Sequence, residues 1–271
     1  MTKHDTLVVL GSGYLAKFLL SLKTSYATIL HTSRDPDNHL AWLAPEQRVR
    51  FDLEQKDTWK NLPSVADVLW CFPAAPIEVI RQFARDRSWA RLVVLGSTSA
   101  YDVGSFRESP PPWIDESAPV DFDKPRVQGE EFLRKECAAV LLRVAGIYGP
   151  GRHPYRWIRS GRVGLSDKYV NLIHVEDLAE ICLAALRCGV PGAVYNVSDG
   201  TPRTWREIGG RLGERHGVPA SGNEQPQQAG KRIGTAKLRS LLLEAGIAIR
   251  HPDLFPSLEH LDEEEGPAAT R

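Results

Sequence analysis

The sequence predicts an α/β fold: a doubly wound parallel sheet with a small C-terminal lobe. Short apolar runs typical of buried parallel strands recur along the chain, and helical patterns separate them. The first run, Leu7–Leu10, leads directly into a glycine turn and then a helical pattern. With 271 residues, 42% of them hydrophobic, the chain is long enough for one such domain and a smaller lobe.

The glycine turn carries the most specific local signal. Gly11, Gly13 and Ala16 form G-x-G-x-x-A between a strand and a helix, which is the context of a dinucleotide-binding motif. Gly11 permits the tight turn, Gly13 lets the backbone approach a pyrophosphate, and Ala16 lets the helix pack on the strand. We therefore predict a cofactor site here, which also includes Tyr14 and Leu15. An ordinary turn that needed small residues is the alternative.

The end of the second predicted strand, Ala27–His31, bears on the choice of cofactor. Ser33 and Arg34 follow it, about 20 residues past the glycines, where the ribose-binding residue of such sites belongs. A hydroxyl and a guanidinium suit a 2′-phosphate, and Asp35 before Pro36 is expected to start the next turn. The pattern favours NADP, with NAD as the second choice. A solvated loop cation is the alternative for Arg34.

The remaining elements continue the alternation. Further strands are predicted over Val49–Leu53, Ala66–Phe72, Ala90–Leu95, Ala138–Val144, Val170–His174 and Ala193–Val197. Helices are predicted over Ile77–Phe83, Arg126–Cys137, Glu176–Leu186, Trp205–Arg215 and Lys237–Glu244. The stretch Val103–Pro119, which contains a run of three prolines, is predicted to be a structured loop without helix or strand.

Two strand ends add candidate cofactor contacts. Asp52 is predicted either to contact the adenine amino group or to cap the helix that begins near Gln55. Phe72, Pro73 and Ala74 enter a small, rigid loop that would let a cofactor ribose lie close to the backbone.

These elements suggest a division of the chain. Residues 1–150, with 170–197 returning to them, form the predicted dinucleotide-binding domain. Residues 151–169 and 198–260 form a substrate lobe. Residues 261–271, acidic and then small, are expected to be a flexible tail.

Composition excludes several classes of protein. Basic and acidic residues number 34 each, so no overall field favours nucleic acid. No apolar run approaches the roughly 18–20 residues of a membrane span, and the N-terminus enters a strand without room for a signal peptide. The four cysteines lack the paired spacing of a zinc site, so we expect reduced thiols, no metal and a cytoplasmic location.

Several motifs together resemble the extended short-chain dehydrogenase/reductases, the NAD-dependent epimerase/dehydratase superfamily. They are GSGYLA, GSTSAY (Gly96–Tyr101), DESAP (Asp115–Pro119), LRVAGIYGPGR (Leu142–Arg152), LIHVEDLA (Leu172–Ala179) and YNVSDG (Tyr195–Gly200). The resemblance runs from Leu7 to about Leu258 and implies a Rossmann-like fold. G-x-G-x-x-A in place of G-x-x-G-x-x-G indicates an atypical branch. A homodimer through the helices near Ile77–Arg87 and Arg126–Cys137 is implied by the resemblance only.

The resemblance also implies a catalytic Ser or Thr, a Tyr and a Lys four residues later. Ser97 matches the hydroxyl that polarises the substrate oxygen, and it is also a predicted cofactor contact. Counting back from Glu130, and forward from Ser97, places the Tyr position at Phe122 and the Lys position at Arg126. The usual proton donor is therefore missing, which typically costs about 10²–10⁴ in rate. Arg126 retains donors for the ribose hydroxyls.

Other residues on segments that border the family's substrate cleft are candidates for the missing role. They are Tyr101, Tyr148, His153 and Tyr155. Tyr101 is grouped with the predicted catalytic residues, and Tyr148, Arg152 and His153 with the predicted substrate contacts. Each of the tyrosines has a packing role as its alternative. The basic run after Arg152 suits an anionic substrate, with a solvated loop as the alternative.

Two functions follow from these patterns. The favoured one is an NADP-dependent oxidoreductase, epimerase or dehydratase that acts on a small molecule, either anionic or neutral, with a non-standard proton donor. The other is a non-catalytic NAD(P)-binding sensor or scaffold, which the missing Tyr supports.

Overall fold

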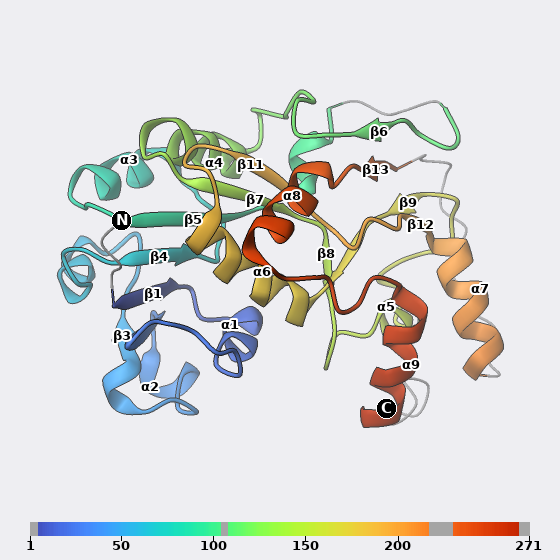
Figure 1. The fold of residues 1–271 in the computed structure, drawn as a ribbon, viewed down its shortest axis with the longest axis horizontal. Helices are drawn as coiled ribbons and strands as arrows, with labels where there is room; N and C mark the ends of the chain where they lie inside the picture. Colours follow the sequence, from blue (N-terminus) through green and yellow to red (C-terminus); the bar gives the residue numbers. More distant parts are fainter. Residues whose placement is uncertain (1–4, 104–107, 217–229, 266–271) are drawn as a thin grey trace.

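The computed structural model describes residues 5–103, 108–216 and 230–265. A parallel sheet of seven strands lies at its centre, in the order β11-β7-β5-β4-β1-β2-β3 (Figure 1). Its strands are β1 (Thr6–Leu10), β2 (Thr28–Ser33), β3 (Arg48–Arg50), β4 (Asp67–Trp70), β5 (Arg91–Ser97), β7 (Val140–Val144) and β11 (Val194–Val197). The chain starts in the middle of the sheet and winds to both edges, which confirms the predicted doubly wound fold.

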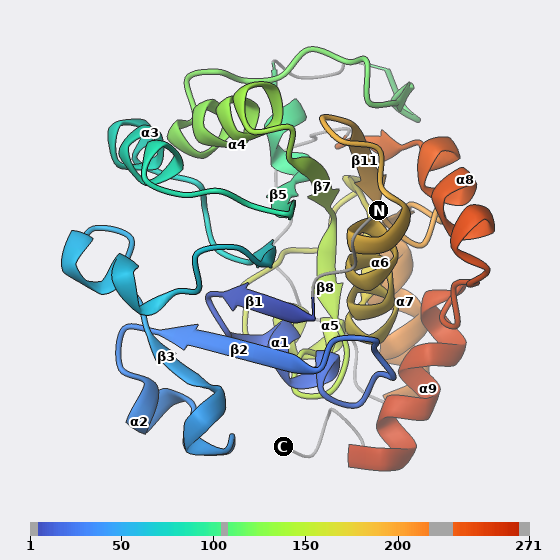
Figure 2. The ribbon, with the colours of Figure 1, turned by 60° about the vertical axis from the view of Figure 1, so that its left-hand side comes forward.

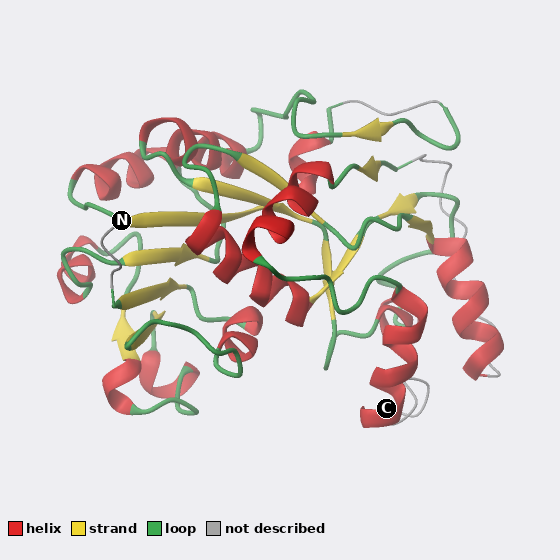
Figure 3. Ribbon diagram, in the orientation of Figure 1, coloured by secondary structure: helices red, strands yellow, loops and turns green. Residues whose placement is uncertain are grey.

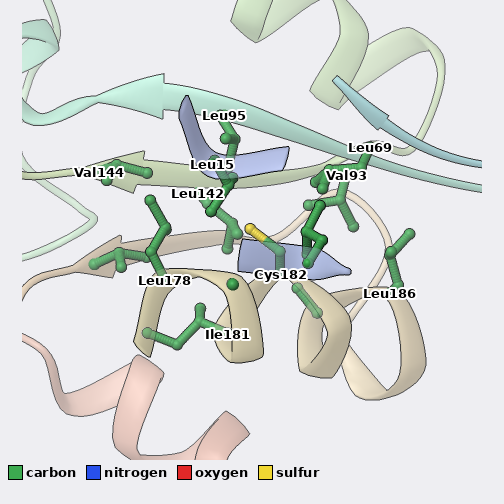
Figure 4. Close-up of a cluster of buried hydrophobic side chains, with 14 of the residues drawn as sticks. Leu15, Leu69, Val93, Leu95, Leu142, Val144, Leu178, Ile181, Cys182 and Leu186 are labelled. Atoms are coloured by element: carbon green, nitrogen blue, oxygen red, sulfur yellow. The ribbon is translucent and has the colours of Figure 1, made fainter. Parts of the chain in front are cut away.

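Helices cover both faces of the sheet (Figures 2 and 3). One face carries α1 (Tyr14–Leu19), α6 (Val175–Cys188) and α8 (Ala236–Ala245). The other carries α3 (Ile77–Arg85), α4 (Pro125–Glu136) and the 3-10 helix η2 (Lys56–Asn61). Figure 4 shows the first core, where Leu15, Leu142 and Cys182 meet between sheet and helices. The four cysteines all lie in the described residues and form no disulfide.

A smaller core lies beyond the carboxyl ends of the strands. Helices α5 (Pro154–Arg159), α7 (Trp205–His216) and α9 (Leu254–Glu265) gather there, on the right of Figure 1. Leu258 and Leu261 of α9 are buried in this core, so the predicted tail is wrong at its start: residues 261–265 are helical. Residues 266–271 lie outside the described part. Helix α8, predicted within the lobe, packs instead on α6 and the sheet.

Short elements complete the fold, and some differ from prediction. They are α2 (Pro36–His39), η1 (Pro45–Gln47), η3 (Thr98–Tyr101), β6 (Trp113–Ile114), β8 (Gly146–Tyr148), β9 (Tyr169–Val170), β10 (Leu172–His174), β12 (Arg203–Thr204) and β13 (Arg232–Ile233). Strand β6 lies in the stretch predicted to lack strands; it pairs with β13, a partner too distant for local patterns to show. The predicted strand Val170–His174 divides between two partners, β12 and β8.

Candidate functional site

The glycine turn after β1 has the geometry that its sequence predicts. Gly11 has φ +82°, and a Cβ there would lie 2.7 Å from Cδ1 of Phe72, so both conformation and space favour glycine. Its N–H donates to Oγ1 of Thr32 at 2.9 Å, which ties the turn to the end of β2. A Cβ on Gly13 would meet open space, so a ligand can approach this backbone.

A cavity of about 850 Å³ opens over this turn, at the carboxyl ends of β1, β2 and β4. Ligands of open α/β sheets bind at this edge. Of the predicted cofactor residues, those that line this first cavity are Gly11, Gly13, Tyr14, Ser33, Arg34, Asp52 and Phe72. Ser12, Lys17 and Trp42, which the sequence analysis did not single out, line it too.

Five predicted cofactor residues are not among the lining of the first cavity, namely Leu15, Pro73, Ala74, Ser97 and Arg126. The Leu15 side chain is buried in the core, so only its backbone remains for a ligand. Ala74 is fully buried against α4, and the next residue, Ala75, lines the cavity in its place. Pro73 is exposed and does not line the cavity.

Arg34 and Asp35, which follow β2, have different surroundings. Asp35 caps α2 by accepting from Asn38 N–H, with Pro36 in the first turn, which confirms the predicted start of a turn. Arg34 is exposed, lines the first cavity and forms no ion pair within the described residues. Asp52 also lines it, while its carboxylate accepts from Glu54 N–H; η2 begins after Gln55.

His31 lies beneath the glycine turn and makes the stability of the folded protein depend on pH. It is fully buried, its Nδ1 lies 3.1 Å from Oγ of Ser12, and burial lowers its pKa to about 4. The unfolded chain, with a His pKa of about 6.5, binds the proton more tightly than the native state, so stability falls as pH drops from 6.5 toward 4. By pH 4.5 this loss amounts to about 2–3 kcal/mol.

We expect His31→Gln to remove that part of the pH dependence. Urea unfolding of both proteins at pH 6.5 and pH 4.5 measures it, and the wild type should lose more stability between the two pH values than the variant. An identical loss in both proteins would show that the His31 ring is not held neutral by burial.

A second cavity of about 560 Å³ lies at the ends of β5 and β7. Ser97 and Tyr101 line it, as do Asp102, Asn171 and Lys231. Aromatic side chains of Trp157, Tyr169 and Trp205 form another part of its wall. Ser97 Oγ accepts from Ser99 N–H at 3.1 Å, which caps η3 and leaves the Ser97 proton to donate to a ligand.

The Tyr101 hydroxyl is held by a buried network. It donates to Oδ1 of Asn196 at 2.7 Å and accepts from Nη1 of Arg143 at 2.9 Å. Burial raises the pKa of Tyr101, and this outweighs the Arg143 charge and hydrogen bond, which lower it. With its proton given to Asn196 and its pKa above the usual value, Tyr101 is a poor proton donor, contrary to its predicted catalytic role.

The predicted Tyr and Lys positions lie outside both cavities. Arg126 Nε donates to Oε1 of the buried Glu130 at 2.8 Å. Gly96 of β5 leaves room for that carboxylate, since a Cβ there would lie 2.7 Å from Glu130 Oε2. Phe122 is 49% exposed and faces Lys135 of α4. The alignment of Phe122 and Arg126 with the family's pair stays a prediction.

The predicted substrate contacts need correction. Tyr148 and His153 are 0% and 2% exposed and line neither cavity. Tyr148 packs edge-on against His174, and Nδ1 of His153 caps α5 by accepting from Tyr155 N–H. Tyr148 and His153 therefore serve packing and capping. Arg152 is exposed and lies over the Tyr14 ring, 4.0 Å from its centre, which places it near the first cavity rather than the second.

Several lining residues of the second cavity were missed. Lys231 and Asp102 form an ion pair, and Nζ of Lys124 also reaches Asp102 at 3.2 Å. Burial raises the pKa of Asp102, but the hydrogen bonds and charges of the two lysines have the larger, opposite effect. The net result is a pKa below the usual value. No local pattern marks Lys231, because it reaches the cavity through contacts with residues far away in the sequence.

A cluster of possible metal ligands lies at the start of α6, outside both cavities. His174, Glu176 and His251 each bring a potential metal-binding atom within 4.8 Å of the others. Nδ1 of His174 accepts from Glu176 N–H and so caps the helix, while the His251 ring stacks on His174 at 3.7 Å. Nε2 of His251 lies 3.2 Å from the Glu176 carboxylate. Through these contacts, the three side chains hold the start of α6 against the segment that precedes α9.

The fold superposes on solved structures of NAD-dependent epimerase/dehydratases and related enzymes. A candidate NAD-dependent epimerase/dehydratase from Methylobacillus flagellatus superposes with a TM-score of 0.74 at 22% identity, over 97% of this chain and 99% of that one. RMD from Pseudomonas aeruginosa, solved with NADPH, gives 0.66 at 20% identity, over 97% and 98%.

A protein of unknown function from Silicibacter pomeroyi also superposes, with a TM-score of 0.69 at 23% identity over 96% of this chain and 99% of that one. At these identities the likeness establishes the fold alone. Among curated proteins, YeeZ of Escherichia coli K12 is 28% identical over 111 residues, which span 40% of this chain and only 39% of YeeZ. No protein-family profile matches the chain. Within the described residues, every helix is too short or too polar to cross a membrane.

Proposed function

We propose that the protein binds NADP(H) in the first cavity and carries out oxidoreductase, epimerase or dehydratase chemistry on a small, anionic molecule in the second. One observation carries the proposal. Cys71, directly after β4, lines the first cavity, and Ser97, at the end of β5, lines the second. These two strands are neighbours in the sheet, and neighbouring strands lie about 5 Å apart.

The residues present fit the dinucleotide. The open backbone at Gly13 suits a pyrophosphate, Asp52 and Phe72 suit the adenosine, and Ser33 with Arg34 suits a 2′-phosphate. When bound, the nicotinamide would supply hydride transfer. Ser97 would donate its hydroxyl proton to the substrate oxygen and polarise it. The aromatic wall and Lys231 suit a small molecule that carries a negative charge.

Arg34→Ala tests the choice of NADP. The unpaired guanidinium is expected to bind the 2′-phosphate, and a charge-assisted contact contributes about 1.5–3 kcal/mol. NADPH affinity, measured by fluorescence titration, should therefore fall about 10- to 150-fold, while NADH affinity changes little. Arg85→Ala, an exposed substitution on α3 away from the cavity, is the control. Equal losses for NADPH and NADH would overturn the 2′-phosphate assignment.

The second candidate, a non-catalytic NAD(P)-binding protein, is favoured by one observation. Phe122, at the predicted Tyr position, is half-exposed and lines neither cavity. Screening small carbonyl compounds for oxidation of bound NADPH separates the two functions. Tight NADPH binding without turnover across a broad panel would favour the sensor.

A further inference from the structure

Lys231 brings an amine into the same cavity as Ser97. Its Nζ donates to the carbonyl oxygen of Thr98 at 2.9 Å and pairs with Asp102. Thr98 directly follows Ser97, so the amine is held next to the strand end that presents the serine hydroxyl. An ammonium has three N–H donors, and these two partners use two of them. Among the described residues, no partner takes the third, which is left for a ligand in the cavity.

The backbone of Lys231 is fixed from several sides. Nδ2 of Asn171 donates to the Lys231 carbonyl at 2.9 Å, and Oδ1 of Asn171 accepts from Ile233 N–H at the same distance. Nε of Arg232 donates to the carbonyl of Pro111, and β13 pairs with β6. The Lys231 side chain is only 16% exposed. The amine is therefore preorganised, as a group that acts on a substrate must be.

The surroundings of Lys231 make its ammonium release a proton more readily than that of an exposed lysine. Burial lowers the pKa of the Lys231 ammonium, and Lys124 and Lys168 lower it further, whereas the Asp102 carboxylate opposes this effect. Lys124 also pairs with Asp102 and donates to the carbonyl of Ser99 at 2.6 Å. If Lys231 becomes neutral, Asp102 keeps Lys124 as its counter-charge, so no carboxylate is left unpaired.

We propose that Lys231 is the proton donor of the reaction, in place of the phenol that the chain lacks. The inference rests on the proposed function. As the substrate carbonyl carbon accepts a hydride from a reduced nicotinamide dinucleotide, an N–H bond of the Lys231 ammonium breaks and an O–H bond forms on the carbonyl oxygen. The product is an alcohol, and the neutral amine then takes a proton from water. In the oxidation direction the amine accepts the proton.

The other candidates in the described residues are less suited. The Tyr101 hydroxyl donates to Asn196, and Phe122 has no proton to give. Tyr169 lines the cavity and is the one remaining phenol there among the described residues, so the experiment must separate it from Lys231.

The first experiment measures the amine itself and needs no substrate. Full-length wild type is acetylated with trace acetic anhydride at a series of pH values, and the labelling of each lysine is followed by mass spectrometry. Lys231 should titrate at lower pH than the exposed Lys60 and Lys237 of the same molecule. Titration together with these two references would overturn the proposal.

The second experiment uses Lys231→Met, Lys231→Arg and Tyr169→Phe with NADPH and a panel of small carbonyl compounds that carry a carboxylate or phosphate, with neutral aldehydes and α-diketones beside them. Lys231→Met should lower kcat about 10²- to 10⁴-fold, the usual contribution of general acid catalysis. NADPH affinity should stay within about two-fold, because Lys231 lies outside the first cavity. Lys231→Arg should be equally slow, since arginine keeps the charge but cannot release a proton.

The outcomes separate this proposal from the function on which it rests. Failure of the wild type to bind NADPH would overturn the proposed function and leave the labelling of Lys231 unchanged. Restored kcat in Lys231→Arg would show that only the positive charge is needed, and a loss confined to Tyr169→Phe would assign the proton to Tyr169. Either result would overturn Lys231 as the donor while NADPH binding stands.

Discussion

Glu131→Ala is expected to lower the free energy of unfolding by about 3–5 kcal/mol, because it leaves a buried charge without its partner. Oε1 of Glu131 accepts from Nη2 of Arg143 at 2.8 Å, and the two side chains are 8% and 3% exposed. The Arg143 guanidinium on β7 cannot reach water without unfolding, so it would keep its full desolvation cost. Urea unfolding at pH 7 measures the loss.

Helix α4 offers a matched control in Glu136, which is exposed on the same helix. Glu136→Ala should change stability by no more than about 0.5 kcal/mol. The double variant Glu131→Ala with Arg143→Met should lose less than Glu131→Ala alone, because it removes both charges. Equal losses in the Glu131 and Glu136 variants would show that the buried pair contributes no stability.

The same network also concerns the second cavity. Arg143 donates to the Tyr101 hydroxyl, and Asn196 N–H in turn donates to Glu116. A chain of buried hydrogen bonds therefore fixes the wall that Tyr101 forms. The sequence motif identified Tyr101 as a site residue, but the catalytic role predicted for it does not agree with this network. The Tyr101 hydroxyl lies between a buried arginine and a buried amide, and its proton and one of its lone pairs are already used in hydrogen bonds. Such a tyrosine positions its neighbours and does not transfer a proton.

Local patterns predicted the first cavity well, for a physical reason. Gly11, Gly13 and Arg34 lie within one strand–turn–helix–strand unit, so their spacing fixes their relative positions. The alternation of apolar runs and helices likewise predicted the sheet. The errors concern residues whose partners are distant in the sequence. Strand β6 forms only by pairing with β13. Helix α9 continues past the predicted boundary because Leu261 packs in a core built from three helices that are separated in the sequence.

The second cavity was harder to predict because it is assembled from distant segments. Ser97 ends a strand and could be found by its motif, but Lys231 is positioned by Asn171, and the next residue, Arg232, by Pro111. No periodicity or spacing connects these residues. Burial was equally hidden: Tyr148 and His153 follow a strand end, as substrate contacts do, yet their side chains turn into the protein.

Gly129→Ala is the second change with a large expected effect, since the added Cβ would lie 1.9 Å from the carbonyl oxygen of Ala74. A backbone oxygen cannot rotate away as a side chain can, so α4 or the loop after β4 must move. Overpacking of this kind costs about 1–3 kcal/mol and occasionally more. We expect a loss at or above the upper end of that range, measured by urea unfolding.

If the first cavity binds NADPH as proposed, this substitution should also weaken that binding, because Ala75, next to the displaced carbonyl, lines the cavity. Gly210→Ala in α7 is the matched control: its Cβ would meet nothing within 4 Å, and alanine in an exposed helix position stabilises by about 0.5–1 kcal/mol relative to glycine. If Gly129→Ala instead gained stability as the control does, the close approach of α4 to the loop would be wrong. If it lost stability while NADPH affinity held, the loop would not shape the cofactor site.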